Sequence, residues 1–229
     1  AQIAVCLHPW GWLGGSMQDP VLDLLLKPLQ ANGYHTIRYN SRGVGGSSGW
    51  PSFTGFTEGK DLEAVVDWSI NYVESLPGKF KVNAVTIIGY SHGSLIATLF
   101  PVLRNPQIKT SYILISYPLG PRSYLTLFRS STYTKKLHDI ISSASSDILI
   151  LYGDQDEFTS RNNYVGWVTE LVKLRKEVTQ PGSVEQGPRL VEHPGLTVAY
   201  RPGASHFWRG RDGIWLADTI ENWLSSPGV

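Results

Sequence analysis

The sequence has 229 residues, of which 41% are hydrophobic, and its 20 basic and 19 acidic residues leave a formal net charge of +1. A chain of this length and composition suits one compact domain, residues 1–229, rather than two. Because neither charge sign clusters, a nucleic acid or an acidic membrane surface is disfavoured as the main partner. No apolar run reaches the length of a membrane span, and no signal peptide is recognisable.

Cys6 is the only cysteine, so the chain has no internal disulfide, which favours a cytoplasmic location. Its apolar neighbours predict a buried thiol rather than a reactive one. The sequence starts without methionine and enters an apolar segment almost at once. We therefore expect that a segment upstream has been removed.

Apolar segments rich in β-branched residues recur along the chain and predict strands. In chain order they are residues 3–7, 34–39, 84–89, 111–116, 147–153 and 196–200. Helical spacing of apolar residues predicts helices between or after them, around residues 62–73, 164–172 and 216–224. Asp19 and Pro20 are typical of an N-cap and first helical residue, and Gly33 of a helix stop.

Alternating strands and helices predict an open, mostly parallel α/β sheet with helices on both faces. Ligands of such sheets bind beyond the carboxyl ends of the strands. The segments that directly follow strands are therefore the candidates for the site. Residues 179–195 precede a strand instead, and we expect them to form a surface loop at the opposite end.

Residues 89–93 have the sequence Gly-Tyr-Ser-His-Gly, which fits the pattern G-x-S-x-G between a predicted strand and a predicted helix. Ser91 has two interpretations there: an N-cap that accepts a helical N–H, or a nucleophile on a strained turn. The second requires glycines at 89 and 93 so that neighbouring backbone can pass close by. A bulky residue at either position is expected to be incompatible with the turn.

A serine nucleophile needs a base, usually a histidine that a carboxylate orients. Among the six histidines, His206 follows the last predicted strand on the side of the site, and the alternative for it is a loop histidine bonded to backbone. Asp156 is the predicted acid, whereas Asp154, next to Gly153, is predicted to form a turn. The chain order Ser91, Asp156, His206 is the order typical of this pattern.

Acyl transfer also needs N–H donors directed at the developing oxyanion. One predicted donor is the backbone N–H of His92, which directly follows the nucleophile. The second is expected from the loop after the first strand, where Pro9 has no N–H. Trp10 is the first candidate there and Gly11 the next.

Five segments carry a family resemblance. They are HPWGWLGGSM, RYNSRGVGGSSG, GYSHGS, GDQDEF and GASHFWRG. Together they resemble the α/β-hydrolase superfamily, and more narrowly its small, largely uncapped, esterase-like serine hydrolases of bacteria and fungi. The resemblance implies Ser91 as nucleophile, Asp156 as acid, His206 as base, residues 8–10 as the oxyanion element and Arg42 as a brace between loops. It also implies two further strands before residue 3, so either these have been removed or residues 34–39 form an exposed sheet edge.

Several aromatic residues lie on the segments that follow strands, and they either pack the loops or line an apolar pocket. The predicted pocket residues are Trp12, Tyr117 and Trp208. Residues 117–146 leave room for one short helix and a loop, which is at most a small lid segment. We therefore expect an open site that takes a small-molecule, ester-like substrate.

The predicted function is hydrolysis of a carboxylic ester or thioester through an acyl-enzyme. A peptidase or amidase that uses the same triad is an alternative, and so is a non-catalytic ligand-binding protein on the same fold. No cofactor and no metal are expected, because the histidines and carboxylates lack ligand spacing. The glycine-rich segment RGVGGSSG also lacks the lysine of a phosphate-binding loop.

Overall fold

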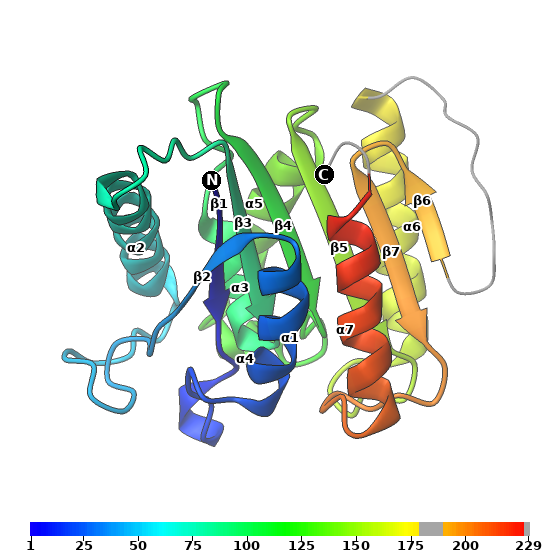
Figure 1. The fold of residues 1–229 in the computed structure, drawn as a ribbon. Coiled ribbons are helices and arrows are strands. Elements are labelled where there is room, and N and C mark those ends of the chain that lie inside the picture. The colour runs from blue at the N-terminus through cyan, green and yellow to red at the C-terminus, as the bar shows by residue number, and fades with distance from the viewer. Residues whose placement is uncertain (179–189, 227–229) are drawn as a thin grey trace.

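The computed structural model describes residues 1–178 and 190–226. A seven-stranded sheet runs through the centre of the molecule (Figure 1). Its strands are β1 (Gln2–Leu7), β2 (Tyr34–Arg38), β3 (Ala84–Tyr90), β4 (Lys109–Ile115), β5 (Ser146–Gly153), β6 (Leu190–His193) and β7 (Leu196–Arg201). The strand order is β2-β1-β3-β4-β5-β7-β6, and every neighbouring pair is parallel except β6 and β7.

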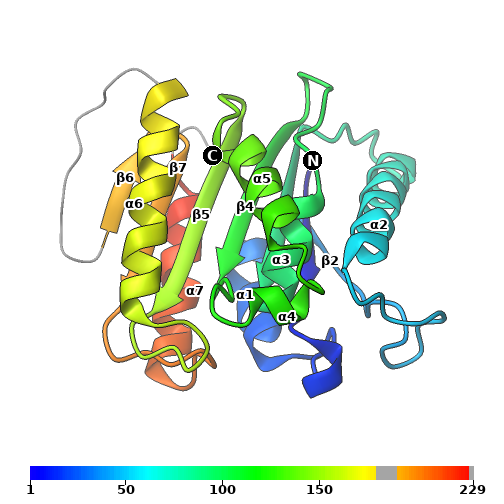
Figure 2. The same ribbon diagram turned by 180° about the vertical axis from the view of Figure 1, so that it is seen from behind.

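Helices cover both faces of the sheet (Figures 1 and 2). The helices of the described residues are η1 (Gly11–Leu13), α1 (Pro20–Ala31), α2 (Phe56–Ser75), α3 (His92–Leu99), α4 (Arg122–Leu125), α5 (Ser130–Ile141), α6 (Arg161–Val178) and α7 (Arg211–Leu224). The apolar sides of α1 and α7 pack on one face, and those of α2, α3, α5 and α6 on the other. None of the described helices is long and apolar enough to cross a bilayer.

The central strands are apolar on both faces because helices cover both of them. In β3, for example, Ile87 packs with the cluster around α3, whereas its neighbour Ile88 packs with α1 and α7. Both side chains are fully buried. Because β1 to β5 and β7 pair in parallel, their carboxyl ends lie together at one edge of the sheet.

The six predicted strands are all present, and the open, mostly parallel sheet is confirmed. Asp19 caps α1 as predicted, with its side chain accepting a hydrogen bond of 2.8 Å from the Val21 N–H. The prediction of a loop over 179–195 is wrong at Leu190–His193, which form β6. This short strand pairs antiparallel with β7, and that pairing outweighs the proline and glycine content of the segment, which predicted a loop. Residues 179–189 of the predicted loop lie outside the described residues.

Strand β2 forms an edge of the sheet, which agrees with the expected exposed edge, and most of its residues are only half-buried. In residues 117–146, only the first part approaches the carboxyl edge. Its short helix α4 lies there, whereas α5 packs Tyr133 and Leu137 into the core. A lid segment would thus be limited to α4 and the residues beside it.

Candidate active site

Ser91 lies at the sharp turn between β3 and α3. Its backbone angles are φ 55° and ψ −120°, a strained conformation for a residue with a side chain. The turn is held by the Ser91 N–H, which donates a hydrogen bond of 2.8 Å to the carbonyl of Ile115 at the end of β4. The side chain makes no capping hydrogen bond to the described part of α3. The N-cap interpretation of Ser91 therefore does not hold.

Gly89 and Gly93 sit where neighbouring backbone comes closest to this turn. A Cβ atom on Gly89 would overlap the carbonyl of Gly93, and one on Gly93 would overlap the carbonyl oxygens of Leu7 and His8. Backbone atoms cannot move aside as a flexible side chain can. The glycines of the motif are thus required by the packing of β1, β3 and α3 around residue 91.

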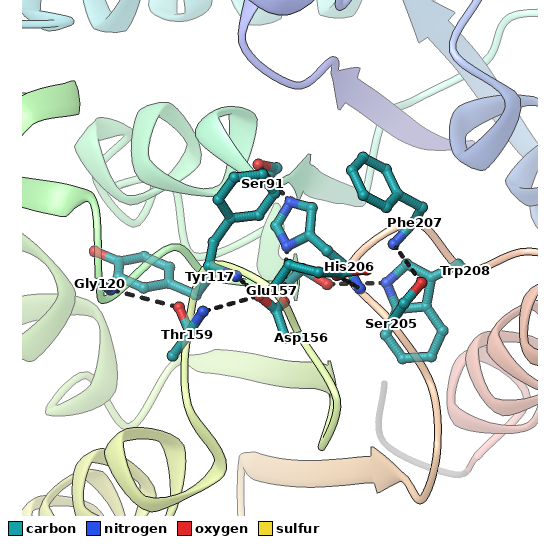
Figure 3. Close-up of polar contacts among 12 residues, drawn as sticks. Ser91, Tyr117, Gly120, Asp156, Glu157, Thr159, Ser205, His206, Phe207 and Trp208 are labelled. Atoms are coloured by element: carbon teal, nitrogen blue, oxygen red, sulfur yellow. Dashed lines mark hydrogen bonds and ion pairs between the residues drawn. The ribbon is translucent and has the colours of Figure 1, made fainter.

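Three side chains from distant parts of the chain form one hydrogen-bonded row beyond the strand ends (Figure 3). His206 Nε2 lies 2.8 Å from Ser91 Oγ, and His206 Nδ1 lies 2.7 Å from Asp156 Oδ2. His206 and Asp156 are almost completely buried. The structure thus brings together the three residues predicted as nucleophile, acid and base.

The carboxylate of Asp156 is held by four hydrogen-bond donors. Its Oδ1 accepts from the backbone N–H groups of Phe158 and Thr159, at 2.8 and 3.0 Å. Its Oδ2 accepts from the Tyr164 hydroxyl at 3.2 Å and faces His206. Burial and the nearby Asp156 charge raise the pKa of Tyr164 well above its usual value, so its hydroxyl remains a donor. These donors fix the orientation of the carboxylate toward the imidazole ring.

The backbone of His206 is held on both sides. Its N–H donates a hydrogen bond of 2.8 Å to Glu157 Oε2, and its carbonyl accepts one of 3.0 Å from the Tyr90 hydroxyl. Tyr90 directly precedes Ser91, and Glu157 directly follows Asp156. Neither role was predicted, because a sequence does not show which backbone group a tyrosine or glutamate will reach.

Asp154 was predicted to form a turn, and its carboxylate is bonded instead to a backbone N–H of another loop. Its Oδ1 accepts a hydrogen bond of 2.7 Å from the Gly203 N–H. This bond joins the turn after β5 to the turn after β7, and Gly203 adopts a positive φ of 79°. Asp154 therefore supports the loop that carries His206, whereas the imidazole ring itself is bonded to Asp156.

His92 and Trp10, the predicted oxyanion donors, flank Ser91 from two elements. His92 is the first residue of α3, where backbone N–H groups have no partner within the helix. Trp10 follows β1 and lines the same pocket as Ser91. Burial lowers the pKa of the His92 imidazole to about 4, so this side chain is neutral at neutral pH.

The loop after β1 is fixed by His8. Its Nε2 accepts a hydrogen bond of 3.0 Å from the Ser41 N–H, and its Nδ1 lies 2.6 Å from the Pro9 carbonyl oxygen. Nearby, Arg42 forms a bidentate ion pair with Asp61, at 2.6 and 2.7 Å, which agrees with the bracing role that the resemblance implies. The first contact joins the loop after β1 to the loop after β2, and the second joins the loop after β2 to α2.

A pocket of about 340 Å³ opens beside Ser91 and His206. Its walls are mostly apolar or aromatic and come from the loops after β1, β4, β5 and β7. Besides Ser91 and His206, the lining residues are Pro9, Trp10, Leu13, Gly14, Gly15, Asp19, Tyr90, Pro118, Pro121, Leu125, Phe158 and Phe207. Within the described residues, no group of three histidine, cysteine or carboxylate side chains could hold a metal ion.

None of the three predicted pocket residues lines this pocket. Tyr117 is fully buried and stacks on Trp167, with ring centroids 4.9 Å apart. Trp208 is buried among α1 and α7 residues, and its Nε1 donates to Ser116 Oγ at 2.9 Å. Trp12 lies in a separate hollow beside residues 43–51. At these positions the prediction is corrected, because position after a strand does not determine the direction of a side chain.

Two comparisons of the sequence with known proteins found similar chains. Residues 8–121 match the model of the X-Pro dipeptidyl-peptidase (S15) family. An uncharacterised protein of Rickettsia prowazekii is 31% identical over 178 residues. That match covers 78% of this chain and 66% of the Rickettsia protein, so it spans just under two thirds of the relative's length.

Solved structures share the whole fold. A protein of unknown function from Agrobacterium tumefaciens, named as a candidate α/β hydrolase, is 27% identical with a TM-score of 0.69, over 98% of this chain and 84% of that one. A Xanthomonas campestris α/β serine hydrolase without a lid is 24% identical with a TM-score of 0.64, over 98% and 83%. The fold, the serine at the β3–α3 turn and these relatives define the class: the chain belongs to the α/β-hydrolase superfamily.

Proposed function

We propose that the protein is a serine hydrolase that cleaves a carboxylic ester or thioester through an acyl-enzyme. The observation that carries the proposal is the unbroken row from Ser91 Oγ through the His206 ring to the Asp156 carboxylate, with 2.8 and 2.7 Å between the polar atoms. Such a row supplies a nucleophile, a base and the carboxylate that orients the base.

In the proposed reaction, Ser91 Oγ attacks the substrate carbonyl while His206 Nε2 accepts its proton. Asp156 stabilises the imidazolium that forms, and the ring then protonates the leaving alcohol or thiol. The N–H groups of His92 and Trp10 would stabilise the negative charge on the substrate oxygen. Water then enters, gives a proton to His206 and attacks the acyl carbonyl, and the carboxylic acid leaves as His206 returns that proton to Ser91 Oγ.

The pocket favours an apolar acyl or aryl group. Its apolar lining includes Trp10, Leu13, Leu125, Phe158 and Phe207. Ligand pockets of this kind bind mainly through apolar contact and orient the ligand through a few polar groups. Ser91 and His206, the proposed reacting groups, line the same pocket.

Amide or peptide cleavage is the second candidate, because part of the chain matches a peptidase family. That match ends at residue 121, so it includes Ser91 and the loop after β1 but neither Asp156 nor His206. It therefore supports the nucleophile without deciding the leaving group. Turnover of an X-Pro p-nitroanilide, compared with p-nitrophenyl esters of increasing chain length, distinguishes the two candidates.

A fluorophosphonate probe tests the proposal against a non-catalytic, ligand-binding protein. Wild-type protein is expected to be labelled at pH 8, and Ser91→Ala is expected to remain unlabelled. Cys6 does not interfere, because burial raises the pKa of its thiol to about 12. Folded wild-type protein that takes up no label would contradict the proposed function.

A further inference from the structure

Exposed apolar side chains gather around the mouth of the pocket. Nine of the fifteen large hydrophobic side chains that are exposed in the described residues belong to loops and short helices that follow strands. We call these nine the rim: Trp12, Leu13, Trp50, Phe53, Tyr124, Leu127, Phe128, Phe158 and Phe207. Their segments lie along the lower edge of the sheet in Figure 1. Trp50, Tyr124 and Phe53 are 87, 80 and 77% exposed.

The rim is continuous with the pocket. Leu13, Phe158 and Phe207 line the pocket itself. A neighbouring hollow, lined by Trp12, Phe53 and Tyr124, shares Trp10 and Leu125 with the pocket. A third hollow includes Trp50 and shares Trp12 with the second. Exposed apolar surface of this extent typically marks an interaction site.

Several charged side chains beside the rim have partners within the protein: Arg42 pairs with Asp61, and Asp19 and Glu58 accept hydrogen bonds from the N–H groups of Val21 and Ser52. Arg122, Arg129 and Arg209 form no ion pair among residues 1–178 and 190–226, and the Arg209 guanidinium lies over the Phe207 ring at 5.4 Å. The carboxylates of Asp154 and Glu157 accept hydrogen bonds from backbone N–H groups. Contact through this surface would therefore depend on aromatic and aliphatic side chains more than on charge, in line with the net charge of +1.

The position of the rim restricts what can cover it. A protein partner or a second copy seated on it would close the opening above Ser91 and keep substrate out. A surface that itself carries the substrate could cover the rim without keeping substrate out of the pocket. Trp, Tyr and Phe side chains at loop tips suit the interface between water and acyl chains, since their rings are apolar with polar or polarisable edges.

We propose that the rim docks on the surface of a bilayer with neutral phospholipid headgroups, from which the pocket takes an ester with an apolar acyl group. The inference rests on the proposed function for its substrate, but docking itself needs no catalysis. Aromatic side chains would enter the headgroup region, as in proteins that lie on a membrane without spanning it. Ser91 and His206 would then face the lipid surface through the pocket mouth.

The test measures partition onto phosphatidylcholine vesicles by sedimentation, with every protein carrying Ser91→Ala so that hydrolysis does not alter the lipid. The rim variant Trp50→Ser with Phe53→Ser is compared with a matched control, Trp68→Ser with Tyr72→Ser. The control residues are also exposed aromatics, but they stack on each other on α2, away from the pocket. Melting curves verify that both variants fold.

The parent protein is expected to bind the vesicles, and the rim variant to bind about tenfold or more weakly, since each large side chain loses the transfer of its apolar surface from water. The control variant is expected to bind as the parent does. Equal binding by both variants, no binding by the parent, or binding only to anionic vesicles would overturn the proposal. So would a dimer of the parent that the rim substitutions dissociate, because the rim would then be an interface between two copies. Fluorophosphonate labelling of the Ser91 protein tests the catalytic proposal separately.

Discussion

The Tyr90 hydroxyl donates a hydrogen bond of 3.0 Å to the backbone carbonyl of His206, and so links the residue before the nucleophile to the residue predicted as the base. The two rings also lie close, with centroids 5.6 Å apart. Because the bond crosses from the β3 turn to the loop after β7, it sets the distance between Ser91 and the imidazole.

Tyr90→Phe is therefore expected to lower kcat by about tenfold with little change in KM, since a small displacement of a base reduces the rate more than binding. Steady-state kinetics on a p-nitrophenyl ester measure both constants. Tyr34→Phe is a suitable control, because Tyr34 is a buried strand tyrosine at the far end of the sheet. A fall in melting temperature that fully explains the loss of rate would count against a positioning role.

Asp154 and Asp156, two carboxylates after β5, are expected to differ in importance. Asp156→Asn removes the charge beside His206 Nδ1 and is expected to lower kcat by about 10⁴-fold, as loss of the carboxylate does in other triads. Asp154→Asn retains an oxygen that can accept from Gly203, so its effect on kcat is expected to be mild. Should Asp154→Asn prove the more damaging substitution, Asp156 is not the acid.

The glycines of the turn give a stability prediction. Gly89→Ala places a methyl group against the Gly93 carbonyl and is expected to destabilise the fold by about 3 kcal/mol or more. Gly166→Ala is the matched control: Gly166 is exposed in α6, a Cβ atom there would meet no neighbour within 4 Å, and alanine should stabilise the helix by about 1 kcal/mol. Urea unfolding of both variants gives the two free energies. Equal effects would mean that the turn tolerates a side chain.

The sequence was sufficient to place the reacting groups because their positions follow from topology. Ser91, Asp156 and His206 each come soon after a parallel strand, and parallel strands end at one edge. The choice between Asp154 and Asp156 was harder, since both lie near the same strand end. It depended on Asp154 following Gly153 directly, which is typical of a turn.

The pocket could not be predicted in the same way. Tyr117 and Trp208 follow β4 and β7, but their backbone conformations turn the side chains into the core. Trp208 has a φ of 48° and stacks on Trp215, with ring centroids 6.0 Å apart. Such turns depend on tertiary packing and leave no periodic signal. Strand β6 was not predicted for a similar reason: its structure depends on pairing with β7 and not on a local sequence pattern.

The half-buried imidazole of His92 predicts how stability varies with pH. Burial, and secondarily the nearby His8, lowers the pKa of His92 to about 4. In the unfolded chain this group binds a proton near pH ~6.5. Its contribution to the free energy of unfolding is therefore complete above about pH 6.5 and is lost as the pH falls toward about 4.

Relative to His92→Gln, the wild-type protein is expected to lose stability more steeply between about pH 6.5 and 4. Urea unfolding at several pH values in this range measures the difference, and the backbone N–H of residue 92 is retained in the variant. Parallel stability curves for the two proteins would show that the imidazole is not kept neutral by burial.

In the proposed reaction, the Ser91 hydroxyl forms a covalent acyl-enzyme. Intact-mass measurement of protein quenched during turnover of p-nitrophenyl acetate, followed by peptide mapping, detects this intermediate. One acetyl group per chain is expected, located on Ser91 and missing in Ser91→Ala. An acetyl group on any other residue, or turnover of the ester by Ser91→Ala at the wild-type rate, would contradict the proposed reaction.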